Sequence, residues 1–207
     1  MIKKYFAALS AIALIGVAPY ALAASSTDLT VTGIITPSAC TPTLSGGGIV
    51  DHGKLSVQDL QQTSQTILPR QTLKLSVNCE AATVFRLNPI DNRPGSSSNG
   101  DLNFGLGLIN GDQKLGHFRG YFKASEADGV AVVPLRSRDN GSSWSASASF
   151  EPDYLNAFGS SSDTTTPIAI KDLVTDLEVR TYIARADSLD LSNEVALDGS
   201  VTLEILY

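Results

Sequence analysis

The chain of 207 residues carries 21 Asp and Glu against 15 Lys and Arg, which gives a formal net charge of −6 at pH 7. Its charges are scattered singly, so it lacks the basic surface that binding to nucleic acid or to an anionic membrane requires. We therefore expect neither among its partners.

The first 23 residues are predicted to be a signal peptide. Met1–Lys4 form a basic start, Tyr5–Val17 an apolar run too short for a comfortable membrane span, and Ala21-Leu22-Ala23 a cleavage signal of small residues. No later stretch reaches ~18 consecutive apolar residues, so no transmembrane segment is expected after cleavage. Residues 24–36 are expected to form an N-terminal extension or first strand, and residues 37–207 a single domain.

Both cysteines, Cys40 and Cys79, lie in the part of the chain that would be exported. Two cysteines in an exported protein favour a disulfide, which would stabilise the fold by roughly 3–4 kcal/mol. A pair of buried free thiols is the alternative. Neither His52 nor His117 stands at ligand spacing from the cysteines, so no metal and no cofactor is predicted.

Alternating apolar and polar side chains predict strands in the first half of the mature chain. An extended run from Leu29 to Thr36 ends before Pro37. Gln71–Asn78 is the clearest interior strand, and Cys79 continues its apolar face. The disulfide would therefore staple two neighbouring strands, while residues 43–51 are expected to form a loop.

The middle of the chain predicts further strands separated by turns. Asn110-Gly111 is a hairpin signal, and Asp91–Asp101 reads as a long loop. The apolar, glycine-rich run Phe104–Ile109 is expected to be a strand that can bend, and it does not fit a phosphate-binding glycine motif. Other strands are predicted at residues 83–90, 114–124, 127–135, 144–150, 168–174 and 176–184.

The last predicted strand is residues 201–207, and the sequence does not indicate which strand pairs with it. Val201, Leu203, Ile205 and Tyr207 alternate with Thr202, Glu204 and Leu206, which predicts one buried face and an edge that must pair with another strand. Eight to ten strands with almost no amphipathic helix predict an all-β fold, an antiparallel β-sandwich.

No catalytic constellation is visible in the sequence. A GxSxG elbow, an HExxH motif and a Cys/His pair are all missing, so an enzyme is not expected. The aromatic residues Phe118, Tyr121, Phe122 and Trp144 could stack on a sugar, although packing in the core is the favoured interpretation.

Several segments resemble fimbrial (pilin) subunits of the chaperone–usher pathway. The matching parts are the signal peptide and residues 31–40, 73–79, 179–183 and 199–207. More narrowly, the mature chain resembles a fimbrial-like exported family of proteobacteria known as a domain of unknown function.

This resemblance implies an immunoglobulin-like, pilin-type sandwich that lacks its last strand and is completed by a donated one. A periplasmic chaperone would lend the strand, and the N-terminal extension of another fimbrial subunit would replace it at an outer-membrane usher. The resemblance implies that Leu29 and Val31 are donor side chains and that Cys40 and Cys79 form the family disulfide. It further implies that the acceptor groove is lined by Val201, Leu203, Ile205 and Tyr207.

The expected function is therefore a structural subunit of a surface fimbria that contributes to cell adhesion, exported through the periplasm to the cell surface. The alternative is a secreted or tip-located adhesin with a self-complete β-sandwich. In a self-complete sandwich, residues 24–32 would fold back beside the terminal strand.

Overall fold

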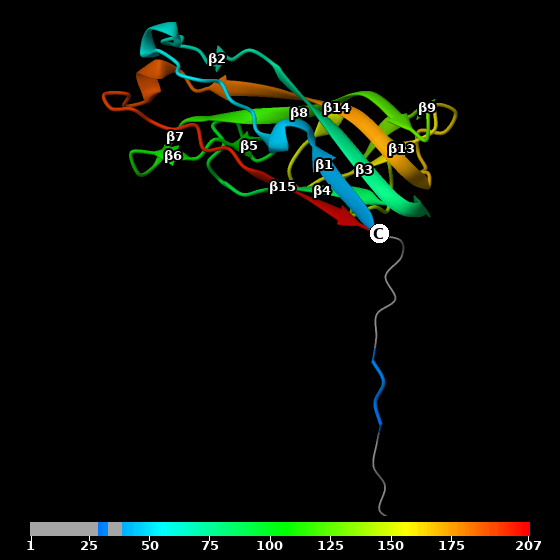
Figure 1. Cartoon of the computed structure of the whole chain (residues 1–207). Helices are drawn as coiled ribbons and strands as arrows, with labels where there is room; N and C mark the ends of the chain where they lie inside the picture. Colours follow the sequence, from blue (N-terminus) through cyan, green and yellow to red (C-terminus); the bar gives the residue numbers. More distant parts are fainter. Residues whose placement is uncertain (1–28, 33–38) are drawn as a thin grey trace, which may run out of the picture. The chain divides into compact units, whose positions relative to one another are not determined.

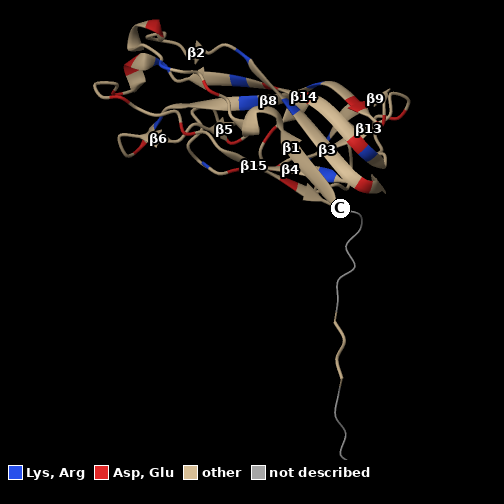
Figure 2. Cartoon of the chain, viewed as in Figure 1, with Lys and Arg blue, Asp and Glu red and all other residues tan. Residues whose placement is uncertain are grey.

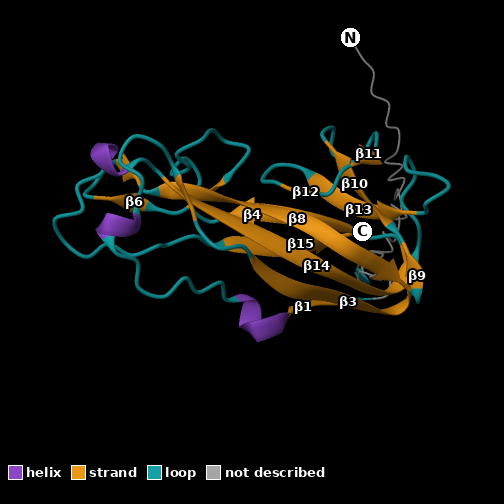
Figure 3. Ribbon diagram, turned by 90° about the horizontal axis from the view of Figure 1, so that it is seen from above, coloured by secondary structure: helices purple, strands orange, loops and turns teal. Residues whose placement is uncertain are grey.

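The computed structural model describes residues 29–32 and 39–207, and in this part of the chain nearly all regular structure is strand (Figure 1). The described residues form 15 strands, eight of which have five or more residues. Every pair of strands is antiparallel. Figure 3 shows the short helical turns in the connections between strands, η1 (Ser45–Gly48), η2 (Val57–Asp59) and η3 (Ala186–Ser188).

The strands form two main sheets. The first has the order β1 (Cys40–Leu44), β3 (Gln71–Thr83), β14 (Ile170–Ile183), β8 (Gly116–Ala127) and β12 (Ser149–Phe150). To it are attached β2 (Thr66–Ile67), β5 (Phe104–Gly105) and β9 (Val130–Ala131). The second has the order β11 (Ser145–Ala146), β10 (Val133–Ser137), β13 (Leu155–Gly159), β4 (Arg86–Asp91) and β15 (Val201–Leu206). A separate hairpin joins β6 (Leu108–Ile109) to β7 (Gln113–Lys114).

Alternate residues of both sheets face a shared apolar core, which confirms the predicted all-β, immunoglobulin-like sandwich. On β14, Leu173, Leu177 and Val179 are buried while their neighbours in sequence are more exposed. The remaining large side chains of this cluster come from both sheets and from the segments that join their strands, among them Leu75, Val77, Phe85, Leu87, Phe104, Phe122, Phe150, Phe158 and Ile170. A smaller cluster at one end of the sheets contains Leu68, Leu106, Ile109, Leu115 and Ile183.

The predicted disulfide is confirmed. Cys40 and Cys79 face each other in the register of β1 and β3, with a Cα–Cα separation of 4.0 Å, and their sulfur atoms are bonded. The strand that carries Cys40 was not predicted, because Pro42 and the following Gly46-Gly47-Gly48 favour a loop. β1 nevertheless forms over Cys40–Leu44 at the edge of its sheet, where a missing proline N–H costs no hydrogen bond.

Two sequence predictions fall wholly or partly outside the described residues. The predicted signal peptide, residues 1–23, lies outside them, as do residues 24–28 and 33–38 of the predicted extension and its continuation. Residues 29–32 are not a strand, and the side chains of Leu29 and Val31 are 89% and 87% exposed.

Some predicted strands are divided or merged. The run Phe104–Ile109 is split between two sheets, because Gly107 has φ +86°, a conformation that favours glycine. The run 144–150 is split into β11 and β12, which belong to different sheets. Residues 168–174 and 176–184 instead form one strand, β14, with a register irregularity against β8 between Val174 and Asp176. Among the described residues, no helix has the length and hydropathy needed to cross a bilayer.

Candidate binding groove

Two edge strands, one from each sheet, lie on the same side of the sandwich (Figure 1). β1 pairs with β3 alone and β15 pairs with β4 alone among the described strands. Edge strands present backbone donors and acceptors that an added strand can use. Position alone therefore makes this side of the sandwich a candidate for pairing.

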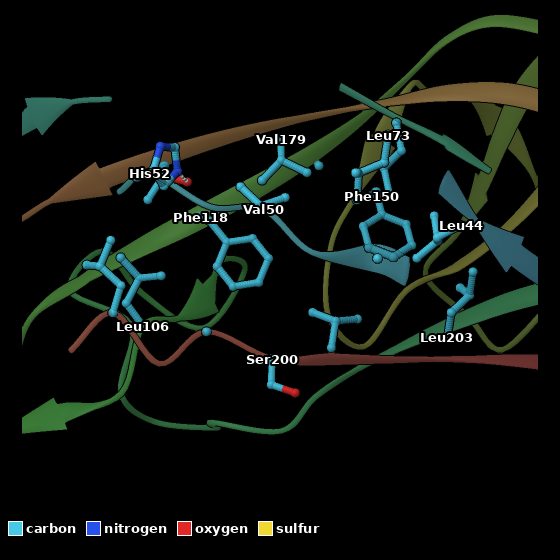
Figure 4. A pocket seen from close by; sticks show the side chains of 17 residues that line it. Leu44, Val50, His52, Leu73, Leu106, Phe118, Phe150, Val179, Ser200 and Leu203 are labelled. Carbon is cyan, nitrogen blue, oxygen red and sulfur yellow. Dashed lines mark hydrogen bonds between the residues drawn. The ribbon is translucent and has the colours of Figure 1, made fainter. Parts of the chain in front are cut away.

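A cavity of about 270 Å³, lined mainly by apolar residues, lies between the two edge strands. Figure 4 shows Leu44 and Leu203 at one end and His52 and Leu106 at the other. The other side chains and backbone positions that line it come from both sheets and from the segments beside them: Gly48, Val50, Leu73, Phe118, Gly120, Phe150, Leu177, Val179, Thr181, Leu197, Gly199, Ser200 and Val201.

The apolar walls of this cavity are only partly covered. Leu44, Val50, Phe118, Val201 and Leu203 pack against the core, yet each stays half-buried. No lining residue carries a charge other than a protonated His52, whereas charges of both signs are interspersed elsewhere on the strands (Figure 2). The cavity therefore favours apolar side chains, and filling it would bury surface that the described residues leave in contact with solvent.

Aromatic rings form the floor of the cavity. The ring of Phe104 lies 5.0 Å from that of Phe118 and 5.5 Å from that of Phe150, between ring centroids. Gly120 of β8 allows this packing, because a Cβ atom there would lie 2.6 Å from Cδ1 of Phe150. The floor is thus fixed by buried neighbours rather than by mobile surface residues.

A second cavity of about 620 Å³ continues from the first. Val50, His52 and Leu197 line both cavities, which joins them into one groove. The second cavity lies between residues 50–60 and residues 191–197, and its lining includes the charged residues Asp51, Lys54 and Glu194. We call the two cavities together the edge groove.

His52 is the titratable group at the junction of the two cavities. Its Nε2 lies 2.9 Å from the hydroxyl oxygen of Thr181, which is buried on β14. Partial burial lowers the pKa of His52, and the negative charge of Asp51 opposes this only in part. A neutral imidazole is therefore favoured in the edge groove near neutral pH.

The residues predicted for the acceptor groove are divided by the structure. Val201 and Leu203 line the first cavity. Ile205 packs against the core beside it, and Tyr207 is 44% exposed beyond the cavity. The hydroxyl oxygen of Tyr207 accepts a hydrogen bond of 2.7 Å from the backbone N–H of Cys40.

Most of the groove was missed by sequence reasoning. Leu44 and Val50 stand on either side of a glycine-rich turn, and the sequence there gives no sign of a buried face. Phe118 and Phe150 were considered as core residues or parts of a strand, but not as partners of the terminal strand. The alternation of Val201 and Leu203 was the only local signal that pointed here.

His117 is the other histidine that sequence reasoning considered, and it lies inside the protein. It is buried on β8, its Nδ1 lies 3.0 Å from the hydroxyl of Ser98, and its ring stacks on Tyr182 at 4.7 Å. Burial, assisted by the positive charge of Arg119, lowers its pKa to about 4. Within the described residues, no cluster of three or more His, Cys, Asp or Glu could hold a metal ion.

Comparison with known proteins gives related sequences. Residues 29–103 match a family model described as a protein of unknown function, DUF1120. The chain is 28% identical to Protein GltF of Escherichia coli strain K12, across 99% of this chain and 98% of that protein. It is 24% identical to Uncharacterized protein YhcF of the same strain, across 88% of this chain and 90% of that protein. The chain is thus similar to a family of unknown function over residues 29–103, which include β1 through β4, and to the two relatives along most of its length.

Proposed function

We propose that this protein is a strand-accepting structural subunit of an exported surface fibre, assembled by a periplasmic chaperone and an outer-membrane usher. The observation that carries the proposal is the edge groove: the apolar walls of its first cavity are half-buried, and each of its two flanking strands has one neighbour among the described strands. An incoming strand would pair with an exposed strand edge and insert alternate side chains into the cavities.

An extended strand fits this groove better than a compact ligand. The groove runs along the direction of β15 through two joined cavities instead of closing around a single volume. A strand can pair its backbone with an edge and place every second side chain inward. Each Leu or Val fully buried in this way would contribute roughly 1.5–3 kcal/mol.

The donor in this proposal is the N-terminal extension of another subunit, of which Leu29 and Val31 are the inserted side chains. These two residues are two positions apart, as inward-facing side chains of a strand must be. Their exposed fractions of 89% and 87% leave them accessible to a partner. In the fibre, each subunit would accept one strand and donate another, and so contribute to a surface structure suited to cell adhesion.

The test is the stability of the purified mature chain with and without a synthetic peptide of residues 24–36. The chain alone should be poorly stable, and a peptide at about 100 times its Kd should raise Tm by roughly 5–10 °C. A peptide with Leu29→Ser and Val31→Ser is the matched control and should have little effect. A chain that melts cooperatively at high temperature and ignores the unmodified peptide would contradict the proposal.

The groove itself is tested by Leu203→Asp in the accepting chain. Because Leu203 lines the cavity and is only half-buried, a carboxylate there should be tolerated by the fold but should oppose an apolar donor. The peptide effect on Tm should be lost. Glu204→Gln, an exposed change on the opposite face of β15, should leave the peptide effect unchanged.

A further inference from the structure

We infer that Tyr207 is a stop that sets the register of the accepted strand. It closes the edge groove at the Cys40 end, so that the incoming strand lies beside β15 from Leu203 toward Leu197 and not beside Ile205. This inference rests on the proposed strand-accepting function and adds which part of β15 is used.

The first step is the bridge that Tyr207 makes between the sheets. Its hydroxyl oxygen accepts the hydrogen bond from the N–H of Cys40, the first residue of β1. Its main-chain oxygen accepts a hydrogen bond from the guanidinium group of Arg86, which lies on β4 opposite Leu206. The residue is therefore held by both sheets, at a point where the groove would otherwise continue.

The partner of the hydroxyl is itself fixed. Cys40 is tied to Cys79 of β3 by the disulfide, and Cys79 is buried in the core cluster. β1 cannot swing away from β3 at this end without breaking a covalent bond. The Tyr207 bridge thus links the end of β15 to an anchored position at the start of β1.

The second step is where the cavity ends. The residues of β15 that follow Leu203 do not line the first cavity. β1 contributes only its final residue, Leu44, to that lining. In the other direction the cavity passes Gly199 and Leu197 and joins the second cavity. The groove is therefore open toward the segment that precedes β15 and closed toward Tyr207.

A stop of this kind solves a problem that apolar pockets alone leave open. If the incoming strand shifts by one residue, its apolar side chains point to solvent. If it shifts by two residues, its apolar side chains point into the groove again. Alternating pockets consequently tolerate two-residue slips of an alternating donor. A side chain that blocks one end removes the registers that would extend past it, so Tyr207 acts as a specificity-determining residue.

The experiment maps the register by photo-crosslinking. Two versions of the 24–36 peptide, each with benzoylphenylalanine near one end, are bound to the mature chain and to Tyr207→Ala, and the crosslinked positions are found by mass spectrometry. The wild-type chain should give one site for each peptide. Tyr207→Ala should give a second crosslinked site two residues away from the first. In the same variant, backbone hydrogen exchange at residues 205–207 should slow when the peptide is bound.

Two further variants separate the contributions. Tyr207→Phe keeps the ring and removes the hydrogen bond to Cys40, a change worth about fivefold in an equilibrium, so the shifted product should appear as a minor species. Tyr154→Phe removes a hydroxyl that does not line the edge groove and should reproduce the wild-type pattern. If Tyr207→Ala does not fold, Tyr207→Phe carries the test alone.

The outcomes distinguish this inference from the function on which it rests. Bound peptide with identical crosslink sites in wild type and in the Tyr207 variants overturns the stop and leaves strand acceptance intact. Absence of crosslinks and of any Tm change with every protein overturns strand acceptance, and the stop falls with it. A shifted crosslink site that appears in the Tyr207 variants, but not in the wild type or in Tyr154→Phe, supports both the stop and strand acceptance.

Discussion

The two lateral edges of the sandwich are built in different ways. At one edge, residues 145–150 supply β11 to the second sheet and β12 to the first, so a single short segment closes both sheets. At the other edge, β1 and β15 come from distant parts of the sequence, and no described segment crosses between them. We call the first the sealed edge and the second the open edge.

Hydrogen bonds hold the sealed edge together. The N–H of Phe122 donates to the carbonyl of Ala148 at 2.8 Å, and the N–H of Ser147 donates to the carbonyl of Pro134 at 2.9 Å. The side-chain amide of Asn156 donates to the carbonyl of Ser149 at 2.9 Å. The fold can thus close an edge with a short crossing, and the half-buried apolar residues of the open edge reflect the lack of such a crossing among the described residues.

The largest expected effect removes the residue that both edges share. Phe150 belongs to the crossing segment and also lines the edge groove, and it is buried. Phe150→Ala should destabilise the chain by about 3–5 kcal/mol in urea unfolding, because it leaves a cavity in the core. It should also weaken the stabilisation by the 24–36 peptide. A decrease below about 1 kcal/mol in the free energy of unfolding, with the peptide effect unchanged, would show that the two edges are independent.

The next largest effect is confined to the open edge. The disulfide joins residues 39 positions apart and holds β1 at the groove. Its reduction should lower the free energy of unfolding by about 3–4 kcal/mol, because the unfolded chain regains the conformational entropy that the bond removed. Urea unfolding of reduced, alkylated protein should show this loss, and the peptide effect should vanish with β1. Protein alkylated without reduction is the control.

A smaller effect is expected when the sealed edge alone is weakened. Asn156 is fully buried and its amide also donates to the carbonyl of Leu135 at 3.4 Å. Asn156→Ala should cost about 1–3 kcal/mol, because a buried carbonyl loses its partner. The peptide effect on Tm should persist, in contrast to Leu203→Asp. Loss of the peptide effect in Asn156→Ala would mean that the sealed edge supports the groove indirectly.

The last effect concerns pH and lies at neither edge. The pKa of His117 falls from 6.5 in the unfolded chain to about 4 in the folded protein, because burial disfavours the charged ring. Its contribution to stability is therefore complete above pH 6.5 and is lost as the pH falls from 6.5 toward 4. The urea midpoint should drop between pH 7 and pH 4.5, and His117→Gln should drop less. An equal drop in both proteins would assign the pH dependence to other groups.

The parts of the fold that could be predicted share one property. β3, β14 and β15 each alternate apolar and polar residues, and a strand with one face in a core imposes that period on its own sequence. The disulfide followed from the number of cysteines in an exported chain. These signals are local or depend on composition, so they survive without knowledge of the topology.

The open edge could not be predicted because its parts meet only in the folded chain. The residues that meet there are far apart in sequence: Leu44, Phe118, Phe150 and Leu203. The sequence around each of them contains no pattern that indicates contact with the other three. β1 itself has a proline and borders a glycine turn, so its strand character comes from pairing with β3 rather than from propensity. The burial of Ile205 against the core and the exposure of Tyr207 likewise depend on where the cavity ends.

The position of the disulfide has a mechanical consequence. Cys40 is the first residue of β1, so a force that pulls on the preceding residues meets the covalent bond before it meets the hydrogen bonds of that strand. The load passes through Cys79 into β3, which has 13 residues and is paired with β14 along most of its length. Tension therefore cannot peel β1 away residue by residue from its start, and it is instead resisted by two long strands at the centre of the first sheet.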